Sequence, residues 1–197
     1  MIVKLDDIAE IQFGPYEKGQ DEGRIKYLLA GHFDDFYQPT IFTKSYIDSS
    51  EKTDRFLLQN NDVILAGKGQ RIFAWAYNDT IGKAVPSSLF YILRAKVEFI
   101  LGEYLAYYLN SQKMQFELKS IGAGATITSI PKKELEHLKL IIPSIDEQKR
   151  IIKLGNLLDR DVELTAKLLE NKKDLKRGLI NKLITNQISV TKTVKKS

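Results

Sequence analysis

The last third of the chain constrains the fold more than any other part. Ser144 followed three residues later by Glu147 is a capping-box pattern, in which each side chain satisfies an unpaired backbone N–H of a first helical turn. Pro143 keeps the chain extended just before this point, and Asp146 and Glu147 occupy positions that the positive end of a helix dipole favours. The pattern therefore predicts a helix that begins at Ile145.

This helix is predicted over residues 145–187, which is on the order of 60 Å at about 1.5 Å per residue. Apolar residues recur along it mainly at intervals of three and four, with an interruption around Lys172 that breaks any regular heptad. The stripe that we expect to be buried consists of Ile151, Leu154, Leu158, Val162, Leu168, Leu175 and Leu179. Because a small domain cannot cover so long a stripe, we expect a partner helix to pack on it. A break near Asn171, after which the helix folds back as a hairpin, is the alternative.

The length of 197 residues suits one core of ordinary size with an appended element. We therefore expect a globular domain over residues 1–144, the helix, and a disordered basic tail over residues 188–197. Hydrophobic content of 43% and charged content of 28% are ordinary for a folded protein.

Several classes of protein are disfavoured by composition. The sequence has no run of eighteen apolar residues and no N-terminal signal pattern, so we expect a cytoplasmic protein without a membrane partner. It has no cysteine and two histidines, His32 and His137, so neither a disulfide nor a protein-held metal is expected.

The charge is unevenly distributed. Residues 1–62 hold 7 Lys or Arg against 12 Asp or Glu, residues 63–144 hold 10 against 6, and residues 145–197 hold 13 against 7. A nucleic-acid partner needs cations that face phosphates. Such cations are expected in the middle of the chain and in the helix, although a bias this small also suits an ordinary solvated surface.

The first 144 residues read as mixed α and β. Strands are predicted at residues 24–29, 62–65, 71–77 and 89–93, where β-branched or aromatic runs are bounded by turn-forming residues. Residues 102–119 predict one helix, and Pro131 suits the start of a short helix that precedes another strand. The expected buried face of the longer helix comprises Tyr104, Leu105, Tyr108, Leu109, Gln112 and Phe116.

No motif for catalysis is present. The sequence has no phosphate-binding loop of the Walker type, no Gly-x-Ser-x-Gly nucleophile turn, and no Asn/Asp-Pro-Pro-aromatic signature of amino-group methyltransferases. His137 lies in a charged segment and is expected at the surface, whereas His32 could contact a ligand or cap a turn. The sequence therefore predicts a protein that is not an enzyme and uses no cofactor.

Five segments in fixed order resemble one repeat of the DNA specificity (S) subunit of type I restriction-modification systems. They are residues 3–11 (VKLDDIAEI), 61–69 (NDVILAGKG), 84–94 (AVPSSLFYILR), 103–111 (EYLAYYLNS) and 124–151, the last ending in IPSIDEQKRI. The resemblance covers about residues 1–187. It implies an α+β target recognition domain that reads a short DNA half-site, followed by a spacer helix that pairs antiparallel with a partner helix.

In that family one S subunit carries two recognition domains, whereas this chain shows one domain and one helix. The resemblance therefore implies half an S subunit, which a second copy could complete by twofold symmetry. It also implies double-stranded DNA, a separate methyltransferase (modification) subunit and a separate restriction subunit as partners, with catalysis in the latter two.

Polar residues of loops in the basic middle region are the candidates for DNA contact. They are Lys68, Gln70, Arg71, Lys83, Ser87, Ser88, Thr126, Thr128, Ser129 and Lys132, the last near a phosphate. Arg and Gln can make paired hydrogen bonds to guanine and adenine edges, whereas hydroxyls more often bind phosphate. Two other interpretations stay open: a protein-interaction module that does not bind DNA, and a remnant S half that needs a different S partner.

Overall fold

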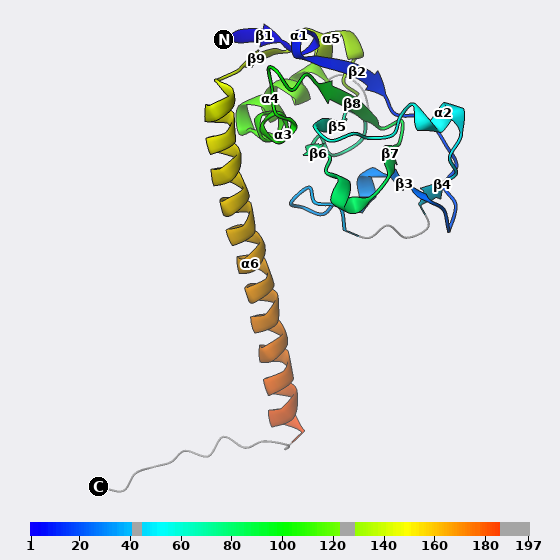
Figure 1. Ribbon diagram of the computed structural model, residues 1–197. Coiled ribbons are helices and arrows are strands. Elements are labelled where there is room, and N and C mark those ends of the chain that lie inside the picture. Colours follow the sequence, from blue (N-terminus) through cyan, green and yellow to red (C-terminus); the bar gives the residue numbers. More distant parts are fainter. Residues whose placement is uncertain (41–44, 123–128, 186–197) are drawn as a thin grey trace, which may run out of the picture. The chain divides into compact units, whose positions relative to one another are not determined.

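The computed structural model describes residues 1–40, 45–122 and 129–185 (Figure 1). The elements in chain order are β1 (Ile2–Lys4), α1 (Leu5–Ile8), β2 (Ala9–Phe13), β3 (Ile25–Leu28), the 3₁₀ turn η1 (Ala30–His32), β4 (Tyr46–Ile47), α2 (Glu51–Asp54), β5 (Asp62–Ala66), β6 (Ala74–Ala76), the 3₁₀ turn η2 (Asp79–Ile81), β7 (Ala84–Pro86), β8 (Phe90–Ala95), α3 (Gly102–Asn110), α4 (Gln112–Ile121), α5 (Lys132–Glu136), β9 (Lys139–Ile141) and α6 (Ile145–Ile184). This order confirms the predicted α+β class with a long helix at the C-terminal end. The chain divides into two compact units, residues 1–155 and 156–197.

The described residues of the first unit form three sheets. The central sheet has four antiparallel strands in the order β2-β8-β5-β6. A second sheet has the order β4-β3-β7, in which β3 runs antiparallel to β4 and parallel to β7. The third is a ribbon of β1 and β9, which pairs the two ends of the first unit.

The central sheet is buried on both faces, and its two central strands show why. Val63 and Leu65 of β5 pack into the core that α3, α4 and α5 cover, whereas Ile64 packs into an aromatic core with Phe73 and Trp75. Successive residues of a strand point to opposite faces. A strand with both faces covered therefore reads as a continuous apolar run, as residues 63–66 do.

The predicted single helix over residues 102–119 is wrong in one respect. Ser111 has an extended backbone (φ −62°, ψ 147°) and separates α3 from α4. This break changes the face that α4 buries, so Met114 and Leu118 are buried, and Phe116, expected in the core, is 76% exposed. The Ser111 hydroxyl donates to the carbonyl of Tyr108 at 2.7 Å, which gives the chain a local alternative to the helical hydrogen bond.

Two tyrosines of α3 complete the open edge of β9. The Tyr108 hydroxyl accepts from the backbone amide of Ile141 at 3.0 Å, and the Tyr104 hydroxyl donates to the Ile141 carbonyl at 3.2 Å. On its other side β9 pairs with β1, where Leu140 faces Val3. Both backbone groups of Ile141 are thus satisfied without a third strand.

The start of α6 belongs to the first unit. The Ser144 hydroxyl accepts from the Glu147 amide at 3.3 Å, which is one of the two hydrogen bonds of the predicted capping box, and the Glu147 carboxylate pairs with Arg150 at 2.8 Å. Gln148 is fully buried: its side chain accepts from the Leu101 amide at 2.9 Å and donates to the carbonyls of Phe99 and Pro143 at 3.0 and 3.1 Å. About two turns further on, a Cβ at Gly155 would lie 2.6 Å from the Tyr107 ring, so a larger residue here would require the ring to move.

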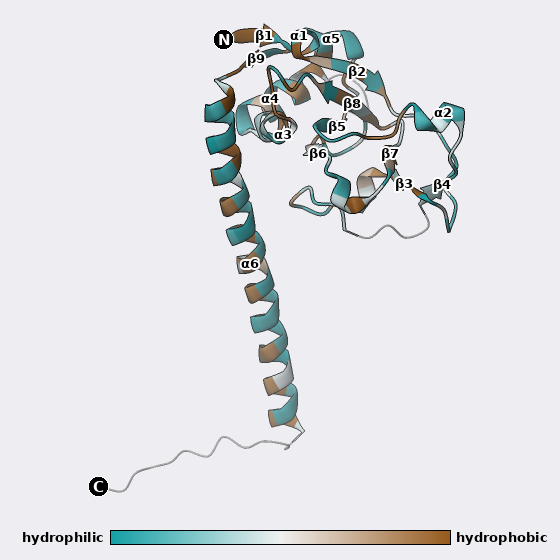
Figure 2. Ribbon diagram, viewed as in Figure 1, coloured by the Kyte–Doolittle hydropathy of each residue, from teal (hydrophilic) through white to brown (hydrophobic). Residues whose placement is uncertain are grey.

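The helix continues without a break to Ile184, so the alternative of a hairpin near Asn171 is wrong. In the second unit apolar side chains recur along α6 between charged ones, as Figure 2 shows by its repeated brown turns. The leucines of the predicted stripe are exposed, for example Leu168 at 53% and Leu175 at 63%. Ion pairs at helical spacing, such as Lys167 with Glu163 at 2.5 Å, lie among them and add modestly to the stability of the helix.

Candidate nucleic-acid interface

One end of the central sheet gathers several loops, and we call it the loop edge. Here β2 ends at Phe13, β5 ends at Ala66, and β6 and β8 begin at Ala74 and Phe90. The loop edge comprises residues 14–20, 67–71 and 87–89, together with Ser129. Six of the predicted DNA-contact residues lie in it: Lys68, Gln70, Arg71, Ser87, Ser88 and Ser129.

Lys68 lies at the loop edge, in the turn that follows β5. Its ammonium group sits 4.7 Å from the centre of the Phe13 ring, and the Phe13 ring packs on the Tyr91 ring at 4.2 Å. The backbone of Lys68 pairs with that of Ser129, which brings the segment before α5 against the turn after β5. An ammonium group has three N–H donors, and those that point away from the aromatic ring can donate to a phosphate.

Gln70 and Arg71 follow in the same turn, but they differ in what holds them. The Arg71 guanidinium donates to the carbonyls of Phe33 and Asp34 at 3.1 and 2.5 Å, and it lies over the rings of Tyr37 and Phe73. Arg71 thus ties the segment after η1 to the loop edge. Gln70 is exposed and lies next to Gly69, whose φ of 115° suits glycine.

Ser87 and Ser88 form the turn between β7 and β8. Ser87 is buried, and its hydroxyl makes no hydrogen bond, while its backbone donates to Leu28 and accepts from Phe90. Ser88 is half-buried. The structure thus places the Ser87 side chain inside the protein and the Ser88 side chain closer to the surface.

The remaining candidates are spread more widely. Lys132 begins α5 beyond Ser129, and its ammonium pairs with Glu136 at 3.4 Å. Lys83 precedes β7 at the end of that strand opposite Ser87, so it is not brought to the loop edge. Thr126 and Thr128 lie outside the described residues, as does the predicted tail at 188–197.

Buried tyrosine hydroxyls support the loop edge from within. The Tyr91 hydroxyl donates to the Ile130 carbonyl at 2.6 Å, and burial, with a smaller effect of Glu136, raises the pKa of Tyr91 to about 12. Burial likewise raises the pKa of Tyr27, whose hydroxyl lies beneath residues 15–17. Both phenols therefore remain neutral hydrogen-bonding groups at physiological pH.

The described residues offer little for metal or acid–base chemistry. Among them, no group of three or more His, Cys, Asp or Glu could hold a metal ion. His32 caps its own turn, since its Nδ1 accepts from the Leu29 amide at 3.1 Å, and burial lowers the pKa of its imidazole. Of the two roles considered for His32, turn capping is the one that the structure shows.

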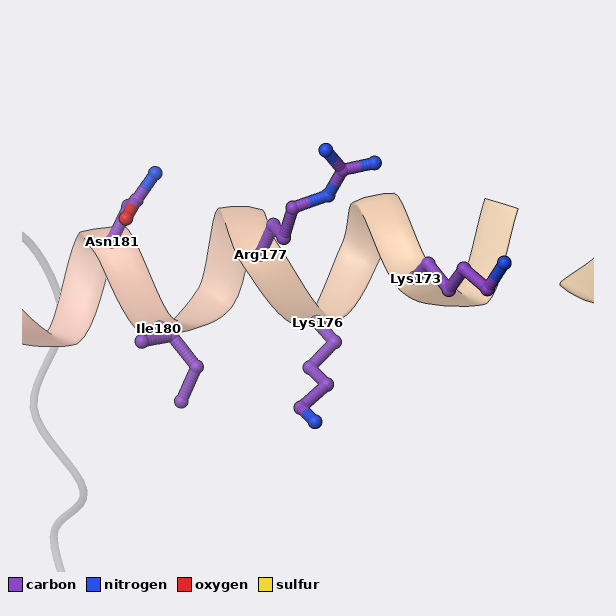
Figure 3. Close-up of a pocket in the computed structure, with 5 residues that line it drawn as sticks. All are labelled: Lys173, Lys176, Arg177, Ile180 and Asn181. Carbon is purple, nitrogen blue, oxygen red and sulfur yellow. The ribbon is translucent and has the colours of Figure 1, made fainter. Parts of the chain in front are cut away.

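The hollow drawn in Figure 3 is lined by one helix alone. Its residues are Lys173, Lys176, Arg177, Ile180 and Asn181. Lys176 and Ile180 point to one side of α6, and Arg177 and Asn181 to the other. The hollow is therefore an open helical surface and not an enclosed binding site.

Comparison with known proteins identifies the family. Residues 1–172 match the family described as "Type I restriction modification DNA specificity domain". The chain belongs to this specificity family. The match confirms the resemblance to the S subunit family that the five sequence segments indicate.

Two specificity-family relatives come from Methanocaldococcus jannaschii. The type I restriction enzyme MjaVIII specificity subunit is 28% identical over 198 residues, which cover 96% of this chain and 46% of that protein. The putative type I restriction enzyme MjaX specificity subunit is 32% identical over 98 residues, or 50% of this chain and 23% of that protein. The chain thus spans less than half the length of these specificity subunits.

Solved structures of specificity subunits share the fold. The type I restriction-modification S subunit from M. genitalium has a TM-score of 0.63 at 18% identity, covering 94% of this chain and 46% of that one. The HsdS subunit from Thermoanaerobacter tengcongensis has a TM-score of 0.60 at 18% identity, covering 92% and 44%. At this identity the likeness concerns the fold. Among the described residues, no helix of this specificity-family chain is both long and apolar enough to cross a membrane.

Proposed function

We propose that this chain is a DNA-recognition subunit of a type I restriction-modification system and acts as half an S subunit. Two copies pair through α6 and place two recognition domains on a bipartite DNA site. The pair docks a methyltransferase subunit and a restriction subunit, which carry out methylation and cleavage. The chain itself has no catalytic role.

The observation that carries this proposal is the exposed apolar stripe of α6 in a chain that matches the specificity family over residues 1–172. A helix with such a stripe gains stability when a second helix covers it, by roughly 1.5–3 kcal/mol for each leucine that becomes fully buried. Lys68 and the exposed Gln70 at the loop edge provide a cation and an amide of the kinds that bind phosphate and base edges.

A two-step experiment tests the proposal. Gel filtration with light scattering gives the oligomeric state of the purified chain, and duplex binding is then measured as a function of salt. We expect a dimer at tens of micromolar and DNA affinity that falls with salt, because phosphate contacts release counterions. A monomer that binds DNA as a complex with a different S half would support the remnant interpretation, and a dimer without DNA affinity would support a protein-interaction module.

A separate assay tests the absence of catalysis. The purified chain is incubated with duplex DNA, S-adenosylmethionine, ATP and magnesium, with and without its modification subunit. We expect methylation only when the modification subunit is present. Methylation or cleavage by the chain alone, lost when the chain is truncated, would contradict the proposed role.

A further inference from the structure

Tyr16 is a large aromatic side chain that the fold leaves in water. It is 83% exposed, more than the partly exposed Phe13 and Leu89 of the same end of the sheet. An exposed aromatic on a mobile loop would need no explanation. The loop that carries Tyr16, however, is fixed on both sides of this residue.

The Tyr27 hydroxyl holds the backbone around Tyr16. It donates to the carbonyl of Pro15 at 2.9 Å and accepts from the amide of Glu17 at 3.0 Å. Pro15 and Glu17 are the two neighbours of Tyr16 in the chain, so the Tyr27 hydroxyl holds the backbone on both sides of this residue.

Further contacts hold the rest of residues 14–20. The Gly14 amide donates to the Phe90 carbonyl at 3.0 Å, and a Cβ at Gly14 would lie 2.3 Å from the Pro86 carbonyl oxygen, so the loop starts in close backbone contact with β7. Its far end is held by Gln20, whose backbone exchanges two hydrogen bonds with Tyr46 at 2.8 and 3.1 Å. The backbone is anchored at both ends and in the middle, and the Tyr16 side chain faces solvent.

Backbone contacts connect this anchored loop to Lys68. The Gly14 amide, at the start of the loop, donates to the Phe90 carbonyl, and the carbonyl of the preceding residue, Leu89, accepts from the Gly67 amide at 3.1 Å. Lys68 follows Gly67, and its ammonium lies over the ring of Phe13, the residue before Gly14. Tyr16 and Lys68 thus belong to one continuous surface, the loop edge.

We propose that Tyr16 is a specificity-determining residue that contacts the base edges of DNA at the loop edge, an inference that rests on the proposed function. A tyrosine has only two side-chain torsions, so its ring can be ordered on binding at low entropic cost when its backbone is already fixed. Its ring can pack on a thymine methyl group in the major groove.

The charges around Tyr16 are mixed, so its neutral ring is the group that it offers to DNA. Within the loop Glu17 pairs with Lys52 at 2.8 Å and Lys18 is exposed, and Asp21 and Glu22 follow the loop. Tyr16 should act through apolar contact, which depends little on salt, whereas Lys68 should act through counterion release.

The test uses the full chain and a sequence that it selects from a random duplex pool. Affinities for that duplex and for one with scrambled half-sites are measured over a range of salt. The variants are Tyr16→Ala and Tyr16→Phe, with Phe116→Ala as the control, because Phe116 is 76% exposed on α4, away from the loop edge. Thermal melting of each variant confirms that it is folded.

We expect Tyr16→Ala to lower the ratio of selected to scrambled affinity roughly tenfold and to leave the salt dependence unchanged. Tyr16→Phe should keep most of the ratio, and Phe116→Ala should keep all of it. Lys68→Ala should instead reduce the salt slope by about 1 and weaken both duplexes alike.

Two results would overturn the inference while the proposed function stands: an unchanged ratio in Tyr16→Ala, or an equal loss of affinity for both duplexes. If the wild-type chain selects no sequence and binds both duplexes equally, the proposed function itself fails. The wild-type measurement alone separates these cases.

Discussion

The side-chain oxygen of Gln148 accepts a hydrogen bond of 2.9 Å from the backbone amide of Leu101, the residue that precedes α3. This bond joins the first turn of α6 to the domain, and the other end of the same amide group donates to the carbonyls of Phe99 and Pro143. Gln148 is fully buried, so water cannot reach its side-chain amide. The three protein hydrogen bonds take the place of bonds to water.

Replacing Gln148 with leucine should therefore destabilise the domain. The change keeps the volume but leaves the Leu101 amide without its partner, at a cost of about 1–3 kcal/mol. Urea unfolding followed by circular dichroism measures the change. Lys149→Ala at the next, exposed position is the control and should stay within about 0.5 kcal/mol. Equal stability of Gln148→Leu and wild type would show that these hydrogen bonds add nothing.

Replacing Leu168 and Leu175 together with glutamate should convert the dimer into a monomer. Each leucine, 53% and 63% exposed in the single chain, would contribute roughly 1.5–3 kcal/mol if the partner helix buries it fully. Light scattering gives the mass. The control Asn181→Glu adds charge on a face of α6 away from the leucine stripe, by the helical repeat of 3.6 residues, and should remain dimeric. A wild-type chain that is monomeric at tens of micromolar would exclude this mode of association.

The proposed pairing also predicts the form of the DNA site. Two identical chains related by a twofold axis read the same half-site on opposite strands, so the site should be an inverted repeat around an unspecified spacer. Inserting four residues near Lys167 adds about 6 Å of helix, comparable with two base pairs at about 3.4 Å each. The preferred spacer should change while the half-sites stay the same. Methylome sequencing of cells that carry the chain and its modification subunit reads both, and an asymmetric motif would indicate a different S half as the partner.

Substitution at the loop edge should have the opposite effect. Gln70→Ala should relax the half-site by about 1–3 kcal/mol for a lost base contact and leave the spacer unchanged. Arg71→Ala is predicted to relax it too, but the Arg71 guanidinium also holds the carbonyls of Phe33 and Asp34, so Gln70 gives the clearer result. Binding to a set of duplexes with single base changes provides the measurement, and an unchanged preference in Gln70→Ala would remove Gln70 from the candidates.

Stability should decline at alkaline pH through the buried tyrosines. The pKa of Tyr91 is raised to about 12 from an unfolded value near 10, so the folded state favours the neutral phenol. This contribution is complete below pH 10 and is lost as the pH rises toward 12. Denaturant midpoints at several pH values should show the decline. Tyr91→Phe should be less stable at neutral pH, and its denaturant midpoint should change less between pH 10 and 12 than that of the wild type. The midpoint of Tyr16→Phe should change as that of the wild type does.

Much of the fold could be predicted because its signals are local. The predicted start of α6 at Ile145 depends on a cap and a proline within four residues, and β3, β5 and β8 coincide with runs of apolar or β-branched residues. The order of five segments identified the family, although each segment alone was a weak signal. Gln148 lies in the most specific of these segments, and its burial gives that pattern a physical reason.

The wrong predictions arise where contacts between residues far apart in the sequence determine the local structure. The short strands β4 and β7 have too few residues to show a period, and they exist because β3 lies between them. The segments before and after Ser111 each have the sequence of a good helix, so the sequence does not show the break between them. The break reverses the burial expected for Phe116. At the loop edge, the buried Ser87 hydroxyl and the bound Arg71 guanidinium have the residue types of DNA contacts, but only the tertiary structure shows what surrounds them.

The two tyrosine hydroxyls on Ile141 also bear on how copies of this chain can meet. An unpaired strand edge is a template on which another chain can add a strand, and growth of that kind has no natural end. At the middle of β9 such an addition would first have to displace Tyr104 and Tyr108 from the backbone. Addition of a strand from another copy is thus discouraged at this edge, which agrees with the proposed association through α6.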